Sequence, residues 1–382
     1  MTILHLTHTD ILSDSRILKE IKVLSGNKDY FIYGLGVLSI SGLVRESLKN
    51  ENVSINSLKI YSKKLNFLPS LIKHPIVFLE LMIKVLLKTS NLNFDVIHCH
   101  DTLVLPIGVL IKKIKKTKLI YDAHELESDR NGQNKIMSKG TFFLEKIMWK
   151  KIDHFISVSH SIINWYQKNL GNKKSTLILN SPELTSKEKI LEKYSDNNKY
   201  FHKKYNISNK TKIFIYLGFL TKGRGIEETI RAFNYYKIKS HVVFIGYGEL
   251  KYNVINSTKN NDRIHFHPPV KHNQVVNMCK SADYGLCLIE NISLSDYYCL
   301  PNKLFEYAFS GLPVLASNFP ELSKVVSNNN LGISCDPDSV SIRDSILKIE
   351  KKPLKKNSLN LYKLSWQYQG EKLLNVYKFL IK

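Results

Sequence analysis

The sequence predicts an α/β protein built from two doubly wound parallel sheets. Short apolar, strand-like runs alternate with helical patterns, and the alternation recurs in both halves of the chain. A length of 382 residues is long for a single core, which also favours two domains. We expect strands at 2–6, 30–33, 95–98, 118–121, 154–158 and 176–179, and then at 213–217, 241–245, 264–266, 284–289, 314–316 and 332–334.

Helical patterns fill the intervals between these runs. The expected helices span 15–25, 107–115, 162–170, 225–235 and 302–309, and an amphipathic helix closes the chain at 365–382. The segment 185–210 is dense in Lys, Asn and Ser and has few aliphatic residues, so we expect the interdomain connection there. The predicted domains are therefore 1–185 and 186–364, with a final helix whose apolar face is able to pack back on the first domain.

The net charge of +23 raises the question of a nucleic-acid or membrane partner. The excess of Lys and Arg is spread over both halves, and the sequence has no Arg–aromatic platform, so no nucleic acid is expected. Weak attraction to an anionic membrane stays open. The five cysteines include no C-x-x-C pair and the N-terminus shows no signal-peptide pattern, so we expect a cytoplasmic protein. A location at the inner face of the cell membrane stays open.

The segment 66–88 is strongly apolar but contains lysines, a histidine, a glutamate and two prolines. It therefore lacks the ~20 apolar residues that a membrane-spanning helix needs. We favour a core helix that precedes the strand at 95–98. The alternative is an interfacial helix that brings the protein to a lipid-borne substrate. A second basic run at 112–118 is either the solvated end of a helix or part of such a surface.

The stretch 301–313, P-N-K-L-F-E-Y-A-F-S-G-L-P, carries the most chemical information. It follows a strand and a polar loop and opens a helix, so its N–H groups lie where parallel sheets bind ligands. Lys303 in the first turn is unfavourable for the helix itself, which makes an anion the natural partner. Glu306 lies one turn further along. The alternatives are an exposed first-turn lysine and a glutamate on the solvent face.

Several motifs, in order along the chain, together resemble the retaining glycosyltransferases of family 4, whose fold is GT-B. They are Y-L-G-F-L at 216–220, G-R-G-I-E at 223–227, F-I-G-Y-G at 244–248 and the stretch 301–313, preceded by D-S-R at 14–16, F-D-V-I-H-C-H-D at 94–101, Y-D-A-H-E at 121–125 and S-V-S at 157–159. The resemblance implies two Rossmann-like domains that face each other across a cleft. The first would bind the acceptor and the second a nucleotide-sugar donor.

For the donor, the resemblance assigns phosphate contacts to Arg224 and Lys303 and the ribose hydroxyls to Glu306. An arginine can donate to two phosphate oxygens, and a carboxylate can accept from two vicinal hydroxyls. Arg224 as a solvated loop residue is the alternative. Backbone close to the diphosphate, or further donor contacts, are expected from Gly218, Gly223, Gly225, Gly246, Tyr298, Asn302 and Leu304.

On the acceptor side, His124 follows a strand at its C-terminal end, where active-site residues of such sheets lie. The resemblance places it beside the donor sugar, which it would position and polarise. A loop-capping histidine is the alternative. Asp101 and Glu125 occupy similar strand ends and would face the acceptor, while Asp14 and Arg16 either join them or simply cap a helix.

Two departures from the family pattern concern the sugar and the phosphate loop. The usual motif is Glu-x7-Glu, of which Glu306 is the second member, but the first position holds Tyr298. An arginine commonly follows the loop glycine, but here Phe219 does, and only Arg224 supplies a cation. No Asp-x-Asp motif lies in a suitable loop, so we expect neither a metal nor another cofactor.

The function predicted from the sequence is the transfer of a hexose-type unit from a UDP- or GDP-sugar to a hydroxyl of a glycan or lipid-linked glycan. The anomeric configuration would be retained, and the product would belong to a cell-surface polysaccharide. A nucleotide-sugar epimerase on the same fold is one alternative. A non-catalytic nucleotide-sugar-binding scaffold is another.

Overall fold

A computed structural model describes residues 1–39, 50–183, 199–271, 274–354 and 361–381. The chain divides into two compact units, which are treated separately below. Unit 1 comprises Met1–Ile178 and Gly370–Lys382, and unit 2 comprises Leu179–Gln369. The chain thus passes from one unit to the other twice.

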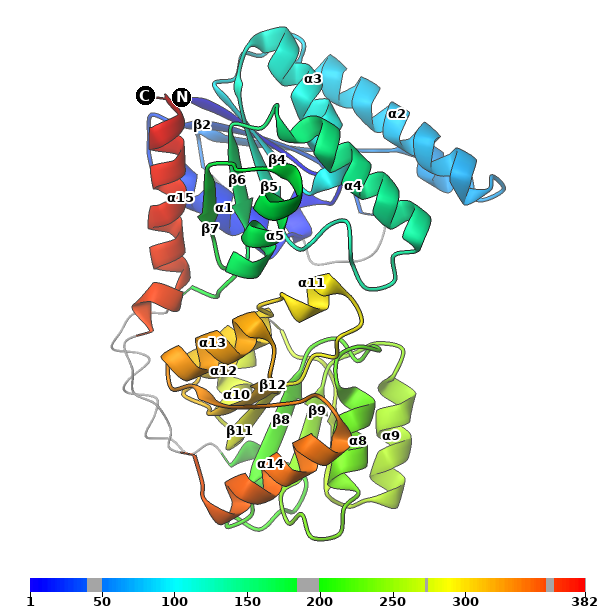
Figure 1. Ribbon diagram of the computed structural model, residues 1–382, viewed down its shortest axis with the longest axis vertical. Coiled ribbons are helices and arrows are strands. Elements are labelled where there is room, and N and C mark those ends of the chain that lie inside the picture. Colours follow the sequence, from blue (N-terminus) through cyan, green and yellow to red (C-terminus); the bar gives the residue numbers. More distant parts are fainter. Residues whose placement is uncertain (40–49, 184–198, 272–273, 355–360, 382) are drawn as a thin grey trace. The chain divides into compact units, whose positions relative to one another are not determined.

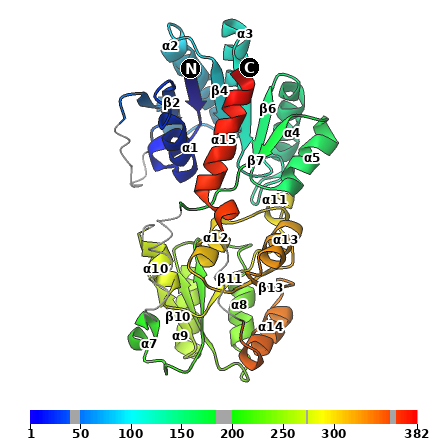
Figure 2. The same cartoon turned by 90° about the vertical axis from the view of Figure 1, so that its left-hand side faces the viewer.

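Unit 1 contains a seven-stranded sheet in the order β3-β2-β1-β4-β5-β6-β7, and its strand pairs are parallel (Figures 1 and 2). Both faces of the sheet are covered by helices, so the central strands are buried, and their mostly apolar sequences also carry His5, His98, His100 and Asp122. The strands are β1 (Thr2–Leu6), β2 (Phe31–Val37), β3 (Val53–Leu58), β4 (Val96–His100), β5 (Lys118–Ala123), β6 (His154–Ser157) and β7 (Ser175–Leu177).

Different helices cover the two faces of the unit 1 sheet. Helices α1 (Ser15–Ser25) and α15 (Trp366–Ile381) lie on one face of the sheet, and α2 (Ser70–Thr89), α3 (Leu105–Lys115) and α4 (Lys135–Trp149) lie on the other (Figures 1 and 2). Helix α5 (His160–Leu170) packs beside α4, where Tyr166 stacks on Trp149. Short 3₁₀ turns lie at Ile11–Ser13, Tyr61–Lys64 and Thr102–Val104.

Unit 2 contains a six-stranded parallel sheet in the order β10-β9-β8-β11-β12-β13. Helices α8, α9 and α14 cover one face, and α10, α12 and α13 cover the other (Figure 1). The elements are α7 (Tyr200–Lys204), β8 (Ile213–Leu217), α8 (Ile226–Phe233), β9 (His241–Ile245), α9 (Lys251–Asn260), β10 (Ile264–His267), α10 (Val275–Cys279), β11 (Tyr284–Cys287), α11 (Leu294–Tyr297), α12 (Asn302–Phe309), β12 (Val314–Ser317), α13 (Pro320–Asn328), β13 (Gly332–Cys335), α14 (Ser339–Lys351) and a 3₁₀ turn (Tyr362–Leu364).

The predicted fold class is confirmed: each unit is a Rossmann-like domain with a parallel sheet between two helix layers. Every strand expected from the sequence is present within a few residues, and the helices at 15–25 and 302–309 have the expected bounds. Strand β3 was missed because Ser54, Asn56 and Ser57 interrupt its apolar pattern at the edge of the sheet. Helix α4 was missed because most of its apolar residues are exposed, so no core-facing period stands out.

The unit boundaries fall at 178/179 and 369/370, whereas the sequence placed them at 185/186 and 364/365. Of the expected connection at 185–210, residues up to 198 lie outside the described part of the chain, and residues 200–204 form α7. The final helix contributes Gly370 onward to unit 1, where Tyr377 is fully buried.

The preference for a core helix at 66–88 was wrong. The segment forms α2, but within its described side chains only Leu81, Val85 and Thr89 are buried. Five other large apolar side chains of α2 are exposed, namely Ile72, Ile76, Leu79, Ile83 and Leu87, and the remaining described large ones are half-buried. Among the described residues, no helix combines the length and the hydropathy that crossing a membrane requires.

Close approach of two strand ends explains why glycines follow β8 and β9. Gly246 has a φ of +152°, and a Cβ there would lie 1.8 Å from the carbonyl oxygen of Gly218. The amide of Gly218 in turn donates to the carbonyl of Ile245. Only residues without a side chain allow the two turns to touch.

We predict that Gly246→Ala destabilises unit 2 by at least about 2 kcal/mol, because the new methyl group collides with backbone and the φ angle is unfavourable. Thermal or urea unfolding of the variant tests this. Gly140→Ala is the matched control, since nothing lies within 4 Å of a Cβ at that helical position. It should leave stability unchanged or raise it by up to about 1 kcal/mol. Equal effects of both variants would contradict the packing described here.

Candidate functional site

The loop between β8 and α8 in unit 2 is held close to the end of β11. Gly225 has a φ of +70°, and a Cβ on it would lie 2.6 Å from the carbonyl oxygen of Leu288. Its N–H donates to a carboxylate oxygen of Glu290 at 2.9 Å, and the amide of Glu290 donates to the carbonyl of Gly223 at 3.0 Å. These contacts fix the glycine loop at the carboxyl edge of the sheet, the edge at which such folds bind ligands.

Helix α12 is anchored to the same edge by Tyr307. The ring of Tyr307 covers Gly285, where a Cβ would lie 2.4 Å from the ring. Its hydroxyl accepts from the amide of Leu217 at 2.9 Å and lies within hydrogen-bond distance of the carbonyls of Ile215 and Leu286. The helix is thereby tied to both β8 and β11, which sets the position of its N-terminal turn.

Lys303, in that first turn, is buried with its charged end unpaired. Only 9% of the residue is exposed, and the ammonium has no hydrogen-bond partner among the described residues. It lies 3.8 Å from the centre of the Tyr216 ring, a favourable cation–π distance. A Cβ on Gly218 would lie 4.0 Å from its Cε, so the side chain reaches the turn after β8. A buried ammonium without an acceptor is expensive, and an anionic ligand would remove that cost.

Arg224, the second predicted phosphate contact, is half-exposed and paired with a neighbouring carboxylate. Its Nη1 lies 3.3 Å from Oδ1 of Asp296, which is buried in α11. Asp296 also accepts from the Ser293 hydroxyl at 3.0 Å. The guanidinium is thus held at the glycine loop, with only one of its donor groups in this ion pair.

The remaining predicted donor contacts lie on the same helix or just before it. Glu306 and Tyr298 are half-buried, Asn302 is exposed, and the side chain of Leu304 is fully buried. Leu304 can therefore offer a ligand only its backbone. Tyr298 holds the position of the family's first glutamate and follows the last residue of the short helix α11. The same helix carries Asp296, the ion-pair partner of Arg224.

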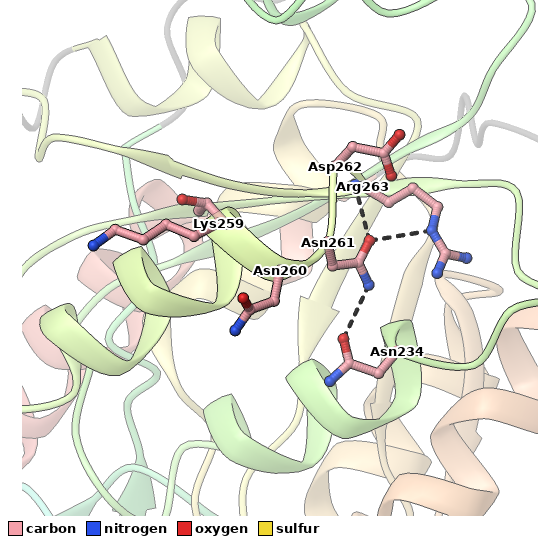
Figure 3. A pocket seen from close by; sticks show the side chains of 7 residues that line it. Asn234, Lys259, Asn260, Asn261, Asp262 and Arg263 are labelled. Carbon is pink, nitrogen blue, oxygen red and sulfur yellow. Dashed lines mark hydrogen bonds between the residues drawn. The ribbon is translucent and has the colours of Figure 1, made fainter.

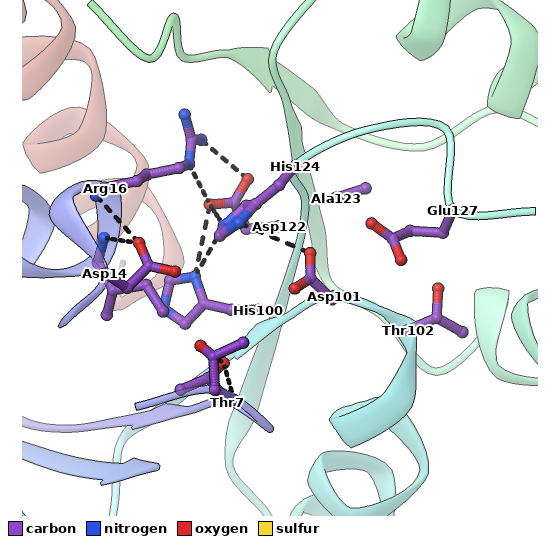
Figure 4. A network of polar contacts seen from close by, with 12 residues as sticks. Thr7, Asp14, Arg16, His100, Asp101, Thr102, Asp122, Ala123, His124 and Glu127 are labelled. Carbon is purple, nitrogen blue, oxygen red and sulfur yellow. Dashed lines mark hydrogen bonds and ion pairs between the residues drawn. The ribbon is translucent and has the colours of Figure 1, made fainter. Parts of the chain in front are cut away.

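In unit 1, His124 lies between two carboxylates (Figure 4). Its Nε2 is 3.2 Å from Oδ2 of Asp122, and its Nδ1 is 3.6 Å from Oδ1 of Asp101. Burial opposes protonation of the ring, but Asp101 and Asp122 outweigh it and raise the pKa of His124 to about 10. Asp101 has a φ of +67° at the end of β4, a strained conformation typical of functional sites.

Arg16 is buried and holds Asp122 in place. Its Nε and Nη2 donate to the two oxygens of Asp122 at 3.1 and 2.9 Å, and its Nη1 donates to the carbonyl of Ile178 at 3.0 Å. Asp14 caps α1 by accepting from two backbone amides. Of the four acceptor-side candidates, Asp14 therefore takes the capping alternative and Arg16 points into the core. Glu125 is exposed, next to the half-buried His124.

A row of buried histidines continues inward from His124. His100 lies 3.3 Å from His124, His5 lies 2.9 Å from His100, and the Tyr377 hydroxyl of α15 lies 2.7 Å from His98. Two groups of described residues have atoms that could ligate a metal ion within 4.8 Å of one another. The first is His5, Glu20, His98 and His100, and the second is His100, Asp122 and His124. The guanidinium of Arg16 already supplies a positive charge here, 3.2 Å from Glu20.

A separate hollow of about 660 Å³ in unit 2 lies away from these residues (Figure 3). It is bordered by the ends of α8 and α9 and by the start of β10, so it lies at the amino edge of the sheet. Asn261 is bonded there to Asn234 and Arg263, which satisfies its amide. The lining residues are Asn234, Thr258, Lys259, Asn260, Asn261, Asp262 and Arg263.

The sequence did not reveal three residues of the two sites. Asp122 is in β5, two positions before His124, which follows the strand, so the two-residue period of extended backbone would have indicated it. Asp296 and Tyr216 contact the predicted cations from distant parts of the chain. Tyr216 belongs to the Y-L-G-F-L motif, but that motif does not show that its ring meets Lys303.

Comparison with known proteins identifies related sequences and the same fold. Residues 45–181 match the model for "Glycosyltransferase Family 4", and residues 197–364 match that for "Glycosyl transferases group 1". The chain is 23% identical to chitobiosyldiphosphodolichol beta-mannosyltransferase of Kluyveromyces lactis, over 90% of this chain and 82% of that protein. Sucrose-phosphate synthase from Thermosynechococcus elongatus has the same fold, with a TM-score of 0.77, 12% identity and coverage of 100% and 99% of the two chains. Anabaena HepE in complex with UDP and glucose gives a TM-score of 0.71, with 14% identity and 99% of each chain covered.

These findings define the class of protein as a two-domain α/β transferase. The chain belongs to the glycosyltransferases of the GT-B fold.

We predict that the His124 side chain stabilises unit 1 most at neutral and acidic pH. Its folded pKa of about 10 exceeds the unfolded value of about 6.5, so the stabilisation is complete below pH 6.5 and is lost as the pH rises through 10. The His124→Gln variant should be less stable than the original protein by at least about 1 kcal/mol at pH 6, with the difference narrowing towards pH 10. Chemical unfolding at three pH values tests this. A difference that does not change with pH would contradict the assigned charge.

Proposed function

We propose that this glycosyltransferase moves a hexose-type sugar from a UDP- or GDP-sugar to a hydroxyl of a glycan or lipid-linked glycan. The reaction would retain the anomeric configuration and serve cell-surface polysaccharide synthesis in the cytoplasm, at the inner face of the membrane. The observation that carries the donor assignment is the buried, unpaired ammonium of Lys303 at the carboxyl edge of the unit 2 sheet.

A nucleoside diphosphate fits the charges at this edge. In a nucleotide-sugar the two phosphates carry about two negative charges, and Lys303, Arg224 and the first-turn N–H groups of α12 supply positive ends. Glu306, one turn further along α12, is proposed to accept from the ribose hydroxyls. The solved structures of HepE contain UDP, glucose and UDP-glucose, which supports a donor of this class.

The same cations account for catalysis. When the glycosidic bond to the donor breaks, negative charge grows on the leaving diphosphate, and fixed cations stabilise that state more than the ground state. Neither a metal nor a further cofactor is part of the proposal, because Arg224 and Lys303 are placed to neutralise the leaving group.

His124 is proposed to position and polarise the donor sugar. With a pKa near 10, the imidazole is protonated at neutral pH, so it donates hydrogen bonds and cannot act as the base that deprotonates the acceptor. A phosphate oxygen of the donor is the proposed acceptor of that proton, which is consistent with attack on the face that the leaving group vacates.

The acceptor class rests on the Kluyveromyces lactis relative. That protein's name describes beta-mannosyl transfer to chitobiosyldiphosphodolichol, a glycan carried on a lipid diphosphate. A lipid-linked acceptor would also explain contact with an anionic membrane, which we include in the proposal. The relative's name describes a β-linkage. Retention, the outcome proposed here, is therefore tested by NMR, which compares the anomeric configuration of the product with that of the donor sugar.

We predict that UDP or GDP raises the melting temperature and that Lys303→Met weakens the binding by about 10- to 100-fold, the value of a hydrogen bond to a charged group. Glu306→Ala and Arg224→Ala should each weaken it as well. Thermal-shift titrations with UDP, GDP, CMP and their sugars measure this. Lys324→Met, which removes an exposed lysine from α13 of the same unit, is the control and should leave the affinity unchanged.

A protein whose melting temperature responds to none of these nucleotides would overturn the donor assignment. Two further outcomes separate the alternatives once a donor binds. Interconversion of the sugar on its nucleotide without an acceptor would indicate an epimerase. Binding without transfer across a panel of acceptors would indicate a nucleotide-sugar-binding scaffold.

A further inference from the structure

The outer helix layer of unit 1 exposes an unusual amount of apolar surface. On α2, one side of the helix carries a row with spacings of three and four residues, which places its members on one stripe. On α4, a second row has spacings of seven and four residues, which also keep its members on one stripe. The rows are Ile72, Ile76, Leu79, Ile83 and Leu87 on α2, and Ile136, Phe143 and Ile147 on α4, each between 38% and 80% exposed.

Both helices belong to the same surface, because α3 packs between them on one face of the sheet (Figures 1 and 2). The end of α3 is tied to its neighbours by two lysines. Lys115 donates to the carbonyl of Ser90 at the end of α2, and Lys112 donates to the carbonyl of Lys151 just beyond α4. Contiguous exposed apolar residues of this kind mark interaction sites on otherwise ordinary proteins.

The charge on this surface is of one sign. The exposed lysines of α4 are Lys135, Lys139 and Lys146, and Lys150 follows at its end. The carboxylate of α4, Glu145, is fully buried and accepts from three hydroxyls.

Glu80, the carboxylate of α2, also has protein partners. Glu80 accepts from the amides of Tyr61 and Ser62 and pairs with Lys84 at 2.6 Å. The α4 row is therefore flanked by exposed lysines, and α2 adds the exposed Lys88 at its end. The described exposed side chains of these two helices include no carboxylate.

We propose that α2 and α4 form one docking surface for an anionic lipid bilayer, with the apolar rows in the interface and the lysines at the headgroups. Apolar side chains flanked by lysines match the two layers of a membrane surface, apolar acyl chains below anionic headgroups. The surface would hold the protein where a lipid-linked acceptor lies, and in that respect it rests on the proposed function. A purely protein partner would not require the uncompensated basic charge along α4.

Binding to lipid vesicles tests this surface directly. The purified protein should sediment with vesicles containing about 30 mol% phosphatidylglycerol, and at least about tenfold less with pure phosphatidylcholine vesicles or in about 0.5 M NaCl. Ile83→Asp combined with Phe143→Asp should reduce binding to the anionic vesicles at least about tenfold. Tyr252→Asp on α9 of unit 2, a similarly exposed residue, should bind like the original protein.

The charge is tested by Lys139→Glu with Lys146→Glu. This pair should lose vesicle binding, whereas Lys324→Glu with Lys348→Glu, the same change in net charge on unit 2, should not. All variants replace exposed residues, and unchanged melting temperatures and nucleotide responses would show that fold and donor site are intact.

No sedimentation of the original protein with anionic vesicles would overturn the proposal, as would equal loss in both lysine pairs. So would a dimer that the Ile83→Asp, Phe143→Asp variant converts to a monomer, because the surface would then bind a second copy of the chain. None of these readouts depends on the donor, so failure here leaves the donor assignment standing.

Discussion

Unit 2 is arranged around one buried positive charge. The ammonium of Lys303 is enclosed at the N-terminal turn of α12, against the Tyr216 ring and without a hydrogen-bond partner in the described chain. Both the charge and the helix end favour an anion at this point. The Tyr307 anchor ties α12 to β8 and β11, and the glycine turns bring the ends of β8 and β9 together. These contacts set the position of the first turn of α12, on which the proposed donor chemistry depends.

In unit 1, by contrast, the charged side chains are paired with charges of opposite sign. Arg16, Asp122, His124 and Asp101 form a buried series in which each cation contacts a carboxylate. Removing one member of such a network would destabilise the unit, because the charge of its partner would be left buried and unpaired. Its consequence is a histidine that stays protonated at neutral pH and is presented at the end of a strand, ready to donate and unable to accept a proton. In the proposed reaction the two units would supply different parts of the transfer: unit 2 the electrostatic stabilisation of a leaving group, and unit 1 a hydrogen-bond donor.

Local patterns predicted much of this, and long-range contacts set the rest. The helix bounds of α12 followed from P-N-K-L-F-E-Y, because the signals that start a helix act within a few residues. The role of its first turn in donor binding remains a proposal from the same residues. Arg16 could not be assigned to Asp122 in the same way, since the two are 106 positions apart. The exposure of α2 was also beyond the sequence. An apolar helix in an α/β pattern is ordinarily core, and only the packed structure shows that its apolar stripe points outward.

A structure of the protein with bound UDP would test the central claim most directly. The account predicts the diphosphate at the loops after β8 and β11, with Nζ of Lys303 within about 3 Å of a phosphate oxygen and Glu306 at the ribose. A diphosphate bound elsewhere, with the Lys303 ammonium still against Tyr216 and unpaired, would contradict it.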